Sequence, residues 1–103
     1  MMLSGKRRAQ LRSEAHHLQA SVHLGQSGVT PAFMKSLDDA IRTHELVKVQ
    51  LGKQTDLSAR DAAGLLAKTT RSAVVQVIGK TVTLYRENPE LRKKRERRAA
   101  EDT

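Results

Sequence analysis

The stretch HLGQSGVTPAF, residues 23–33, contains the turn from a strand into a helix and thereby decides the fold class. Before it, Ala20–Leu24 predicts a short strand with alternate apolar residues. At its end, Thr30 and Pro31 form a strong helix start, because threonine caps free N–H groups and proline suits the first helical position. A strand followed at once by a helix favours an α/β fold.

Periodicity extends this pattern on both sides of the turn. A helix from Pro31 to about Thr43 is predicted, with one apolar face made of Phe33, Leu37, Ala40 and Ile41. The segment Leu46–Leu51 alternates as a strand with one buried face. Upstream, Ser4 is the expected cap of a first helix that ends near His17, with an inward stripe of Leu11, Ala15 and Leu18.

The second half of the chain predicts one more helix and a hairpin. The helix begins near Asp56 or Ser58 and turns Ala62, Ala63 and Leu66 inward, with Leu65 as a further candidate for the inward face. Gly64 inside this helix lowers helix stability by about 1 kcal/mol relative to alanine, and close packing at this position would be a reason for the glycine. Two β-branched runs, Ala73–Ile78 and Thr81–Tyr85, flank Gly79-Lys80, which is typical of a two-residue hairpin turn.

The expected order is therefore α-β-α-β-α-β-β in a two-layer α/β sandwich. Strands joined through a helix can lie parallel, and the hairpin is antiparallel, so we expect a four-stranded mixed sheet with helices on one face. The other face is then open. Alternation places these candidates on it: His23, Lys48, Gln50, Gln76 and Tyr85.

Composition limits the possible functions. A chain of 103 residues forms one domain with a small core, and it has no cysteine, so disulfides and thiolate zinc sites are excluded. No stretch approaches the ~20 apolar residues of a membrane-spanning helix, and the N-terminus lacks the apolar segment of a signal peptide. We expect a cytoplasmic, monomeric protein without cofactor or metal.

The net charge of +8 lies mainly in the predicted domain. Residues 1–86 hold thirteen Lys and Arg against six Asp and Glu, which gives +7, whereas residues 87–103 hold six against five and give +1. An excess of this size favours an anionic partner such as nucleic acid. The boundary at residue 86 separates a domain from a charged tail, expected as a solvated helix or a disordered segment.

Two features of the domain suit phosphate. Gly25 and Gly28 stand where a strand meets a helix N-terminus, and glycines let a phosphate oxygen approach bare N–H groups. In KH domains a Gly-x-x-Gly loop clamps the nucleotide backbone, although strand-to-helix turns are rich in glycine in any case. The first helix carries an unusual set of cations near its N-terminus, opposed to the helix dipole: Lys6, Arg7, Arg8 and Arg12.

Three segments carry a resemblance to a known family: LGQSG at 24–28, HELVKV at 44–49 and VVQVIGKTVTLYR at 74–86. Together they resemble the CRM domain (chloroplast RNA splicing and ribosome maturation), in particular its stand-alone bacterial YhbY-like members. The resemblance covers nearly all of residues 3–86. It implies a fold similar to the C-terminal domain of the third translation initiation factor.

The resemblance also implies a function, namely binding of structured ribosomal RNA during large-subunit assembly. The family's loop corresponds to Gly25, Gln26, Ser27 and Gly28, and its basic first helix to Lys6, Arg7, Arg8 and Arg12. Thr30 and Lys48 complete the set of expected RNA-binding residues. Unlike a KH loop, this one joins a strand to a helix, so KH-like reading of bases in a groove is not assumed.

Other chemistry has little support in the sequence. Neighbouring His16 and His17 point about 100° apart on a helix, without an acidic partner at metal-ligand spacing. Asp38 and Asp39 are expected on the solvated side of their helix, and no nucleophile, base and orienting group come together. We therefore expect no enzymatic activity and no small-molecule substrate.

Three alternatives stay open. The chain could be a sequence-tolerant nucleic-acid binder, for which duplex DNA competes as well as ribosomal RNA. It could be a protein-interaction adaptor that uses the open sheet face and the tail. Within RNA binding, the sheet face could be a second contact surface on which Tyr85 stacks a base.

The RNA-binding hypothesis also predicts a salt dependence. If the protein contacts about five phosphates, the slope of log K against log salt should be about −3.5 to −4.5.

Overall fold

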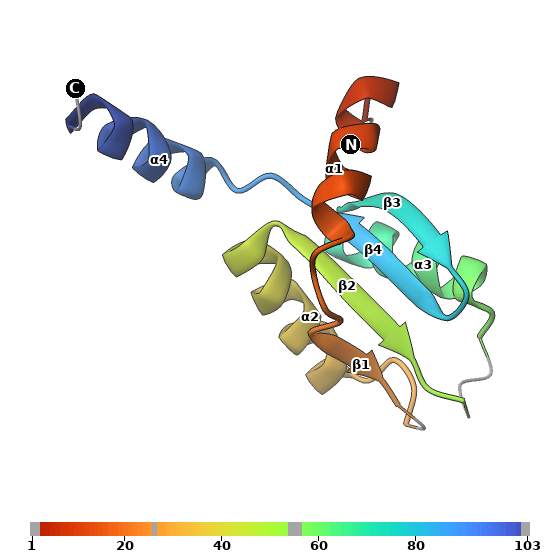
Figure 1. The fold of residues 1–103 in the computed structure, drawn as a ribbon. Helices are drawn as coiled ribbons and strands as arrows, with labels where there is room; N and C mark the ends of the chain where they lie inside the picture. Colours follow the sequence, from red (N-terminus) through yellow and green to blue (C-terminus); the bar gives the residue numbers. More distant parts are fainter. Residues whose placement is uncertain (1–2, 26, 54–56, 102–103) are drawn as a thin grey trace.

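The computed structural model describes residues 3–25, 27–53 and 57–101 and contains four strands and four helices within these ranges (Figure 1). The elements follow in the order α1 (Gly5–Ala15), β1 (Val22–Leu24), α2 (Pro31–His44), β2 (Leu46–Leu51), α3 (Ala59–Thr70), β3 (Ala73–Ile78), β4 (Thr81–Tyr85) and α4 (Pro89–Glu101). The predicted α-β-α-β-α-β-β order is confirmed, and a helix follows it in the tail.

The sheet is mixed, as expected, with strand order β1-β2-β4-β3. β1 and β2 are parallel, with Leu24 beside Leu51, and the other pairs are antiparallel. At the β3–β4 turn Gly79 has a φ of 56°, a left-handed conformation that glycine adopts without strain. This is the hairpin that the Gly-Lys pair predicts.

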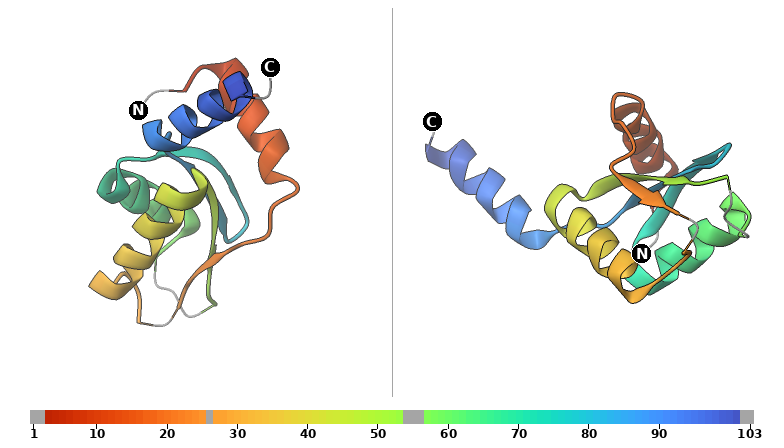
Figure 2. Two further views of the ribbon diagram at one scale, coloured as in Figure 1. Left: turned by 90° about the vertical axis from the view of Figure 1, so that its left-hand side faces the viewer. Right: turned by 90° about the horizontal axis from the view of Figure 1, so that it is seen from below.

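Helices α2 and α3 cover one face of the sheet and enclose the main core (right view of Figure 2). Leu37 and Ile41 of α2 and Leu66 of α3 are fully buried there, against alternate residues of the strands. The expected inward residues of both helices are buried or half-buried, except Leu65, which is 42% exposed. Gly64 is exposed, and a Cβ built on it meets no atom within 4 Å, so no close packing requires this glycine.

The expectation that all helices share one face is wrong for α1, which packs against the opposite face (Figure 2). Leu11 and Ala15 are fully buried against Leu46, Val75 and Tyr85, which form an apolar patch at one end of that face. A helix with an apolar stripe must bury it, and this patch is the apolar surface that α2 and α3 leave uncovered. The fold class is confirmed, with one helix added on the far side of the sheet.

This placement overturns two further expectations. Tyr85 is only 8% exposed beneath α1, so its ring is not available to stack on a base. Leu18 is 41% exposed rather than buried, because α1 ends at Ala15 and the chain turns away before Leu18. The part of the α1 face beyond the helix stays uncovered and carries His23 and Gln50, both exposed as expected.

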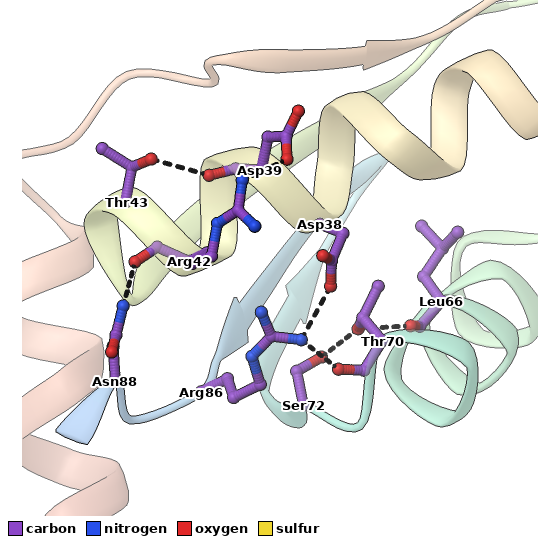
Figure 3. Close-up of polar contacts among 9 residues, drawn as sticks. All are labelled: Asp38, Asp39, Arg42, Thr43, Leu66, Thr70, Ser72, Arg86 and Asn88. Carbon is purple, nitrogen blue, oxygen red and sulfur yellow. Dashed lines mark hydrogen bonds and ion pairs between the residues drawn. The ribbon is translucent and has the colours of Figure 1, made fainter. Parts of the chain in front are cut away.

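Polar contacts hold the ends of α2, α3 and β4 together (Figure 3). Arg86, just after β4, donates to the Asp38 carboxylate at 2.8 Å and to the Thr70 carbonyl oxygen at 2.7 Å. It thereby joins both helices and satisfies a carbonyl at the C-terminus of α3. Asp38, expected on a solvated surface, is half-buried and has this structural partner.

Helix α4 extends away from the sheet and buries none of its residues (Figure 1). It is tied to the domain at Glu45, whose carboxylate accepts from the Asn88 backbone N–H at 2.7 Å and from Arg95 at 3.1 Å. From Pro89 to Glu101 the tail is a helix without buried residues. None of the described helices is long and apolar enough to cross a bilayer.

Candidate nucleic-acid interface

The Gly25–Gly28 corner is a tight turn at the surface. The Gly28 N–H donates to the Gly25 carbonyl at 3.1 Å, and Gly28 has a φ of 72°, which only glycine adopts readily. A Cβ built on either glycine meets no atom within 4 Å, so the approach to the main chain is open. Ser27 is exposed, whereas Gln26 lies outside the described residues.

Helix α2 starts directly behind this corner. The Thr30 hydroxyl accepts from the Phe33 N–H at 3.1 Å, and the Thr30 N–H donates to the Gly28 carbonyl at 3.1 Å. Thr30 is therefore a structural cap that fixes the loop to the helix start. No acidic residue lies in the first turn of α2, so the positive end of its dipole is uncompensated there.

Two lysines that we did not predict stand at the same end of the sheet. Lys53 follows Gly52, whose N–H donates to the carbonyl of Leu24, the residue before the loop. The carbonyl of Lys80 accepts from Leu51 N–H at 2.8 Å, which brings the hairpin turn beside the end of β2. Both lysines are exposed, and neither has an ion pair within the described ranges.

The sequence holds a signal for these lysines. Gly-Lys follows a strand twice, as LGK at 51–53 and as IGK at 78–80, and each pair follows the end of its strand. The register of the sheet brings both ends to the Gly25–Gly28 corner. Helix α3 also begins here, with Arg60 exposed in its first turn and partly offset by Asp61. We call this set, the corner with Lys53, Arg60 and Lys80, the loop end.

Helix α1, which carries the other predicted cations, lies at the opposite end of the sheet, as Figure 1 and the left view of Figure 2 show. Arg7 bonds Tyr85, which pairs with Leu46 at the start of β2, whereas the loop follows Leu24, which pairs with Leu51 at its end. That length of strand spans about 17 Å at about 3.4 Å per residue. The loop and the basic first helix, both expected to bind RNA, are therefore separated by the length of β2.

Two of the α1 cations, Arg7 and Arg8, are half-buried. The Arg7 guanidinium lies over the Tyr85 ring, 5.1 Å from its centre, and donates to the Tyr85 hydroxyl at 3.2 Å. This hydrogen bond raises the pKa of Arg7 above its usual value, so the charge is permanent. Arg8 is half-buried, with its Nε covered. Lys6 and Arg12 are exposed and remain available to a ligand.

Lys48 belongs to neither end. It lies half-buried on the α1 face of the sheet, and its ammonium donates to the Leu18 carbonyl at 3.0 Å. His16 and His17 lie nearby, edge to face, with ring centres 6.4 Å apart. Within the described ranges no three His, Asp or Glu side chains gather as a set of potential metal ligands.

Comparison with known proteins agrees with this architecture. The model of the CRS1/YhbY (CRM) domain matches residues 3–86. The chain is 39% identical to the probable RNA-binding protein YqeI of Bacillus subtilis over 86% of this chain and 93% of that protein. It is 34% identical to the probable RNA-binding protein PA4753 of Pseudomonas aeruginosa over 86% of each.

A solved structure extends the likeness to three dimensions. The solution structure of protein SAV1595 of Staphylococcus aureus superposes with a TM-score of 0.71 at 35% sequence identity. The match covers 84% of this chain and 91% of the other. α4 begins at Pro89, beyond the matched residues 3–86. With a family model matched from the first turn of the domain to the end of β4, this chain belongs to the CRS1/YhbY (CRM) domain family.

Proposed function

We propose that the protein is a non-enzymatic RNA-binding module that holds structured RNA by its phosphate backbone at the loop end. The observation that carries this proposal is the open Gly25–Gly28 corner. There, a sterically open main chain, a helix N-terminus and cations without an ion pair in the described ranges share one end of the sheet. Family membership and relatives that are named probable RNA-binding proteins support RNA as the ligand.

In this mechanism the corner and the cations have different roles. A phosphate oxygen approaches the open main chain of the corner, where the dipole of α2 adds a positive potential. Lys53 and Lys80 neutralise the flanking phosphates from the ends of β2 and the hairpin. Contacts of this kind set position and affinity without selecting a base sequence.

The α1 cations form a second, weaker contact in the proposal. Lys6 and Arg12 are exposed on α1, which lies at the other end of the sheet from the loop (Figure 2), so only an RNA long enough to span both ends reaches them. This favours a folded RNA over a short single strand. We further propose that the physiological RNA is ribosomal RNA of the large-subunit precursor, with the protein acting in the cytoplasm on the assembling particle.

Fluorescence anisotropy with labelled RNA fragments tests the proposal. Gly25→Asp together with Gly28→Asp puts two carboxylates where the phosphate binds, and aspartate tolerates the left-handed conformation of Gly28 better than most residues do. We expect affinity for a large-subunit RNA fragment to fall at least about 100-fold, since repulsion replaces the helix-dipole attraction.

The matched control is Gly25→Asn together with Gly28→Asn, which adds similar bulk without charge. We expect the Asn pair to keep most of the affinity. Circular dichroism should show both variants folded. Unchanged RNA affinity in the folded Asp pair would remove the corner from the mechanism. Equal competition by duplex DNA would instead favour the sequence-tolerant binder.

A further inference from the structure

On the α1 face of the sheet, a hollow of about 250 Å³ lies between the end of α1 and the β3–β4 hairpin. Its lining comes from the residue that caps the C-terminus of α1 and from three strands: His16, Lys48, Gln76, Ile78, Thr81 and Thr83. From this hollow we infer a second ligand site: it receives one base that has left the stack of an RNA bound at the loop end. The inference rests on the proposed function and adds base contact to it.

The floor of the hollow holds an unsatisfied polar group. Thr83 is 1% exposed in the middle of β4, between Lys48 on β2 and Gln76 on β3. Its hydroxyl has no hydrogen-bond partner within the described part of the chain. A buried hydroxyl without a partner is destabilising, and such groups in native proteins call for an explanation. A ligand that bonds to it supplies one.

The surrounding side chains suit a base better than a phosphate. Gln76 is half-exposed, and its amide offers both a donor and an acceptor, as the edge of a base requires. Thr83 Oγ1 is covered, so a ligand reaches it only when a neighbouring side chain moves, and Gln76 is its register partner on β3. The ammonium of Lys48 is already held by the Leu18 carbonyl, so its stem rather than its charge lines this hollow.

The rim provides surfaces for stacking. Ile78 is an apolar side chain that is 62% exposed, and His16 offers an imidazole ring on the opposite side. Unstacked bases pack against aromatic and apolar side chains in this way. The volume is below the ~300 Å³ at which pockets for drug-sized ligands begin, which suits a single base.

The position of the hollow links it to the loop end. Ile78 and Thr81 flank the Gly79-Lys80 turn, and Lys80 belongs to the loop end. An RNA strand held there can pass the turn and place a base on the sheet face. A second hollow, of about 380 Å³, lies on the other side of Lys48, but the Glu14 carboxylate in its lining repels phosphates.

NMR titration of ¹⁵N-labelled full-length protein locates the two sites separately. The probes are inorganic phosphate, the four 5′-nucleoside monophosphates and a ten-nucleotide single-stranded RNA. We expect phosphate to move the amide signals of Gly25 and Gly28 only. At least one nucleotide and the RNA should also move those of Gln76, Ile78 and Thr83. RNA that moves the loop signals alone would overturn the inference and leave the proposed function standing, whereas no response to any RNA would overturn both.

Thr83→Val is the sharpest variant, since it replaces an unpartnered buried hydroxyl by a methyl group of similar shape. We expect a higher Tm together with about fivefold weaker binding of the single-stranded RNA. Binding of a fully paired RNA duplex, whose bases stay stacked, should not change. A higher Tm with unchanged single-strand affinity would overturn the inference.

A second pair of variants does not touch the core. Ile78→Ser removes the apolar rim, and Val77→Ser is the matched control, because Val77 is also exposed but faces the other side of β3. We expect Ile78→Ser to lower the affinity for the single-stranded RNA about threefold and Val77→Ser to leave this affinity unchanged. Equal effects of the two variants would contradict the site.

Discussion

The two ends of the sheet carry similar numbers of cations but differ in what those cations contact. At the α1 end, Arg7 bonds Tyr85, so this part of the charge stabilises the fold, and Arg8 is half-buried and less accessible to a ligand. At the loop end, Lys53 and Lys80 are exposed and without ion pairs within the described ranges. A cluster of cations in a sequence is therefore a poor measure of how many cations are accessible to a ligand in the folded protein.

Of the variants that compare the two ends, charge reversal at the loop end should have the largest effect. Lys53→Glu with Lys80→Glu removes two phosphate contacts and adds two repulsions, each worth about 0.6 kcal/mol, so RNA affinity should fall about 50-fold. Fluorescence anisotropy at fixed salt measures the change. A smaller loss of affinity than that caused by Lys6→Glu with Arg12→Glu would show that the α1 end, and not the loop end, is the main RNA contact.

The α1 pair is the matched comparator, with the same change in net charge. Lys6→Glu with Arg12→Glu should lower the affinity for a long folded RNA about fivefold, because only a ligand that spans both ends reaches these residues. A ten-nucleotide RNA should bind the variant as it binds the parent protein. Equal losses for short and long RNA would show that both ends act as one site.

Arg7 should matter more to folding than to binding. Arg7→Ala loses the hydrogen bond and the cation–π contact with Tyr85, and we expect a loss of about 1 kcal/mol in the free energy of unfolding. Urea denaturation measures it, and Lys6→Ala, one residue earlier and exposed, is the control without such contacts. An RNA affinity reduced more by Arg7→Ala than by Lys53→Ala would contradict the structural role.

Two glycines sharpen the comparison further. Gly64 lies on the exposed side of a helix interior, with space for a methyl group. Gly64→Ala should therefore stabilise the protein by about 0.5–1 kcal/mol and leave RNA affinity unchanged. Gly28→Ala has the same space but a φ of 72°, so it should destabilise by about 1 kcal/mol. Thermal denaturation of both variants measures whether each change stabilises or destabilises the protein. Changes of the same sign would contradict the role given to the left-handed backbone at Gly28.

Local patterns predicted most of the fold because local chemistry decides it. Thr30-Pro31 fixed the start of α2, alternation fixed β2, and Gly79-Lys80 fixed the hairpin. The side on which α1 packs depends instead on contacts distant in sequence. Its signal was present, since Leu46 and Tyr85 are apolar residues on the face that we expected to be open.

The candidate site was predicted only in part, for a related reason. The open corner at Gly25 and Gly28 could be inferred from a strand, a turn and a helix cap that are contiguous in the chain. The lysines beside it come from two other segments, and only the register that joins Leu24 to Leu51 and Leu51 to Lys80 brings them there. The same register separates the corner from α1.

The salt dependence of RNA binding by a variant with Lys53→Gln and Lys80→Gln tests the central claim most directly. With a short single-stranded RNA, the slope of log K against log salt should become shallower by about 1.4, which corresponds to two lost phosphate contacts. The matched Lys6→Gln and Arg12→Gln variant should keep the parent slope. A parent-like slope for the loop-end variant, with a shallower one for the α1 variant, would contradict the account.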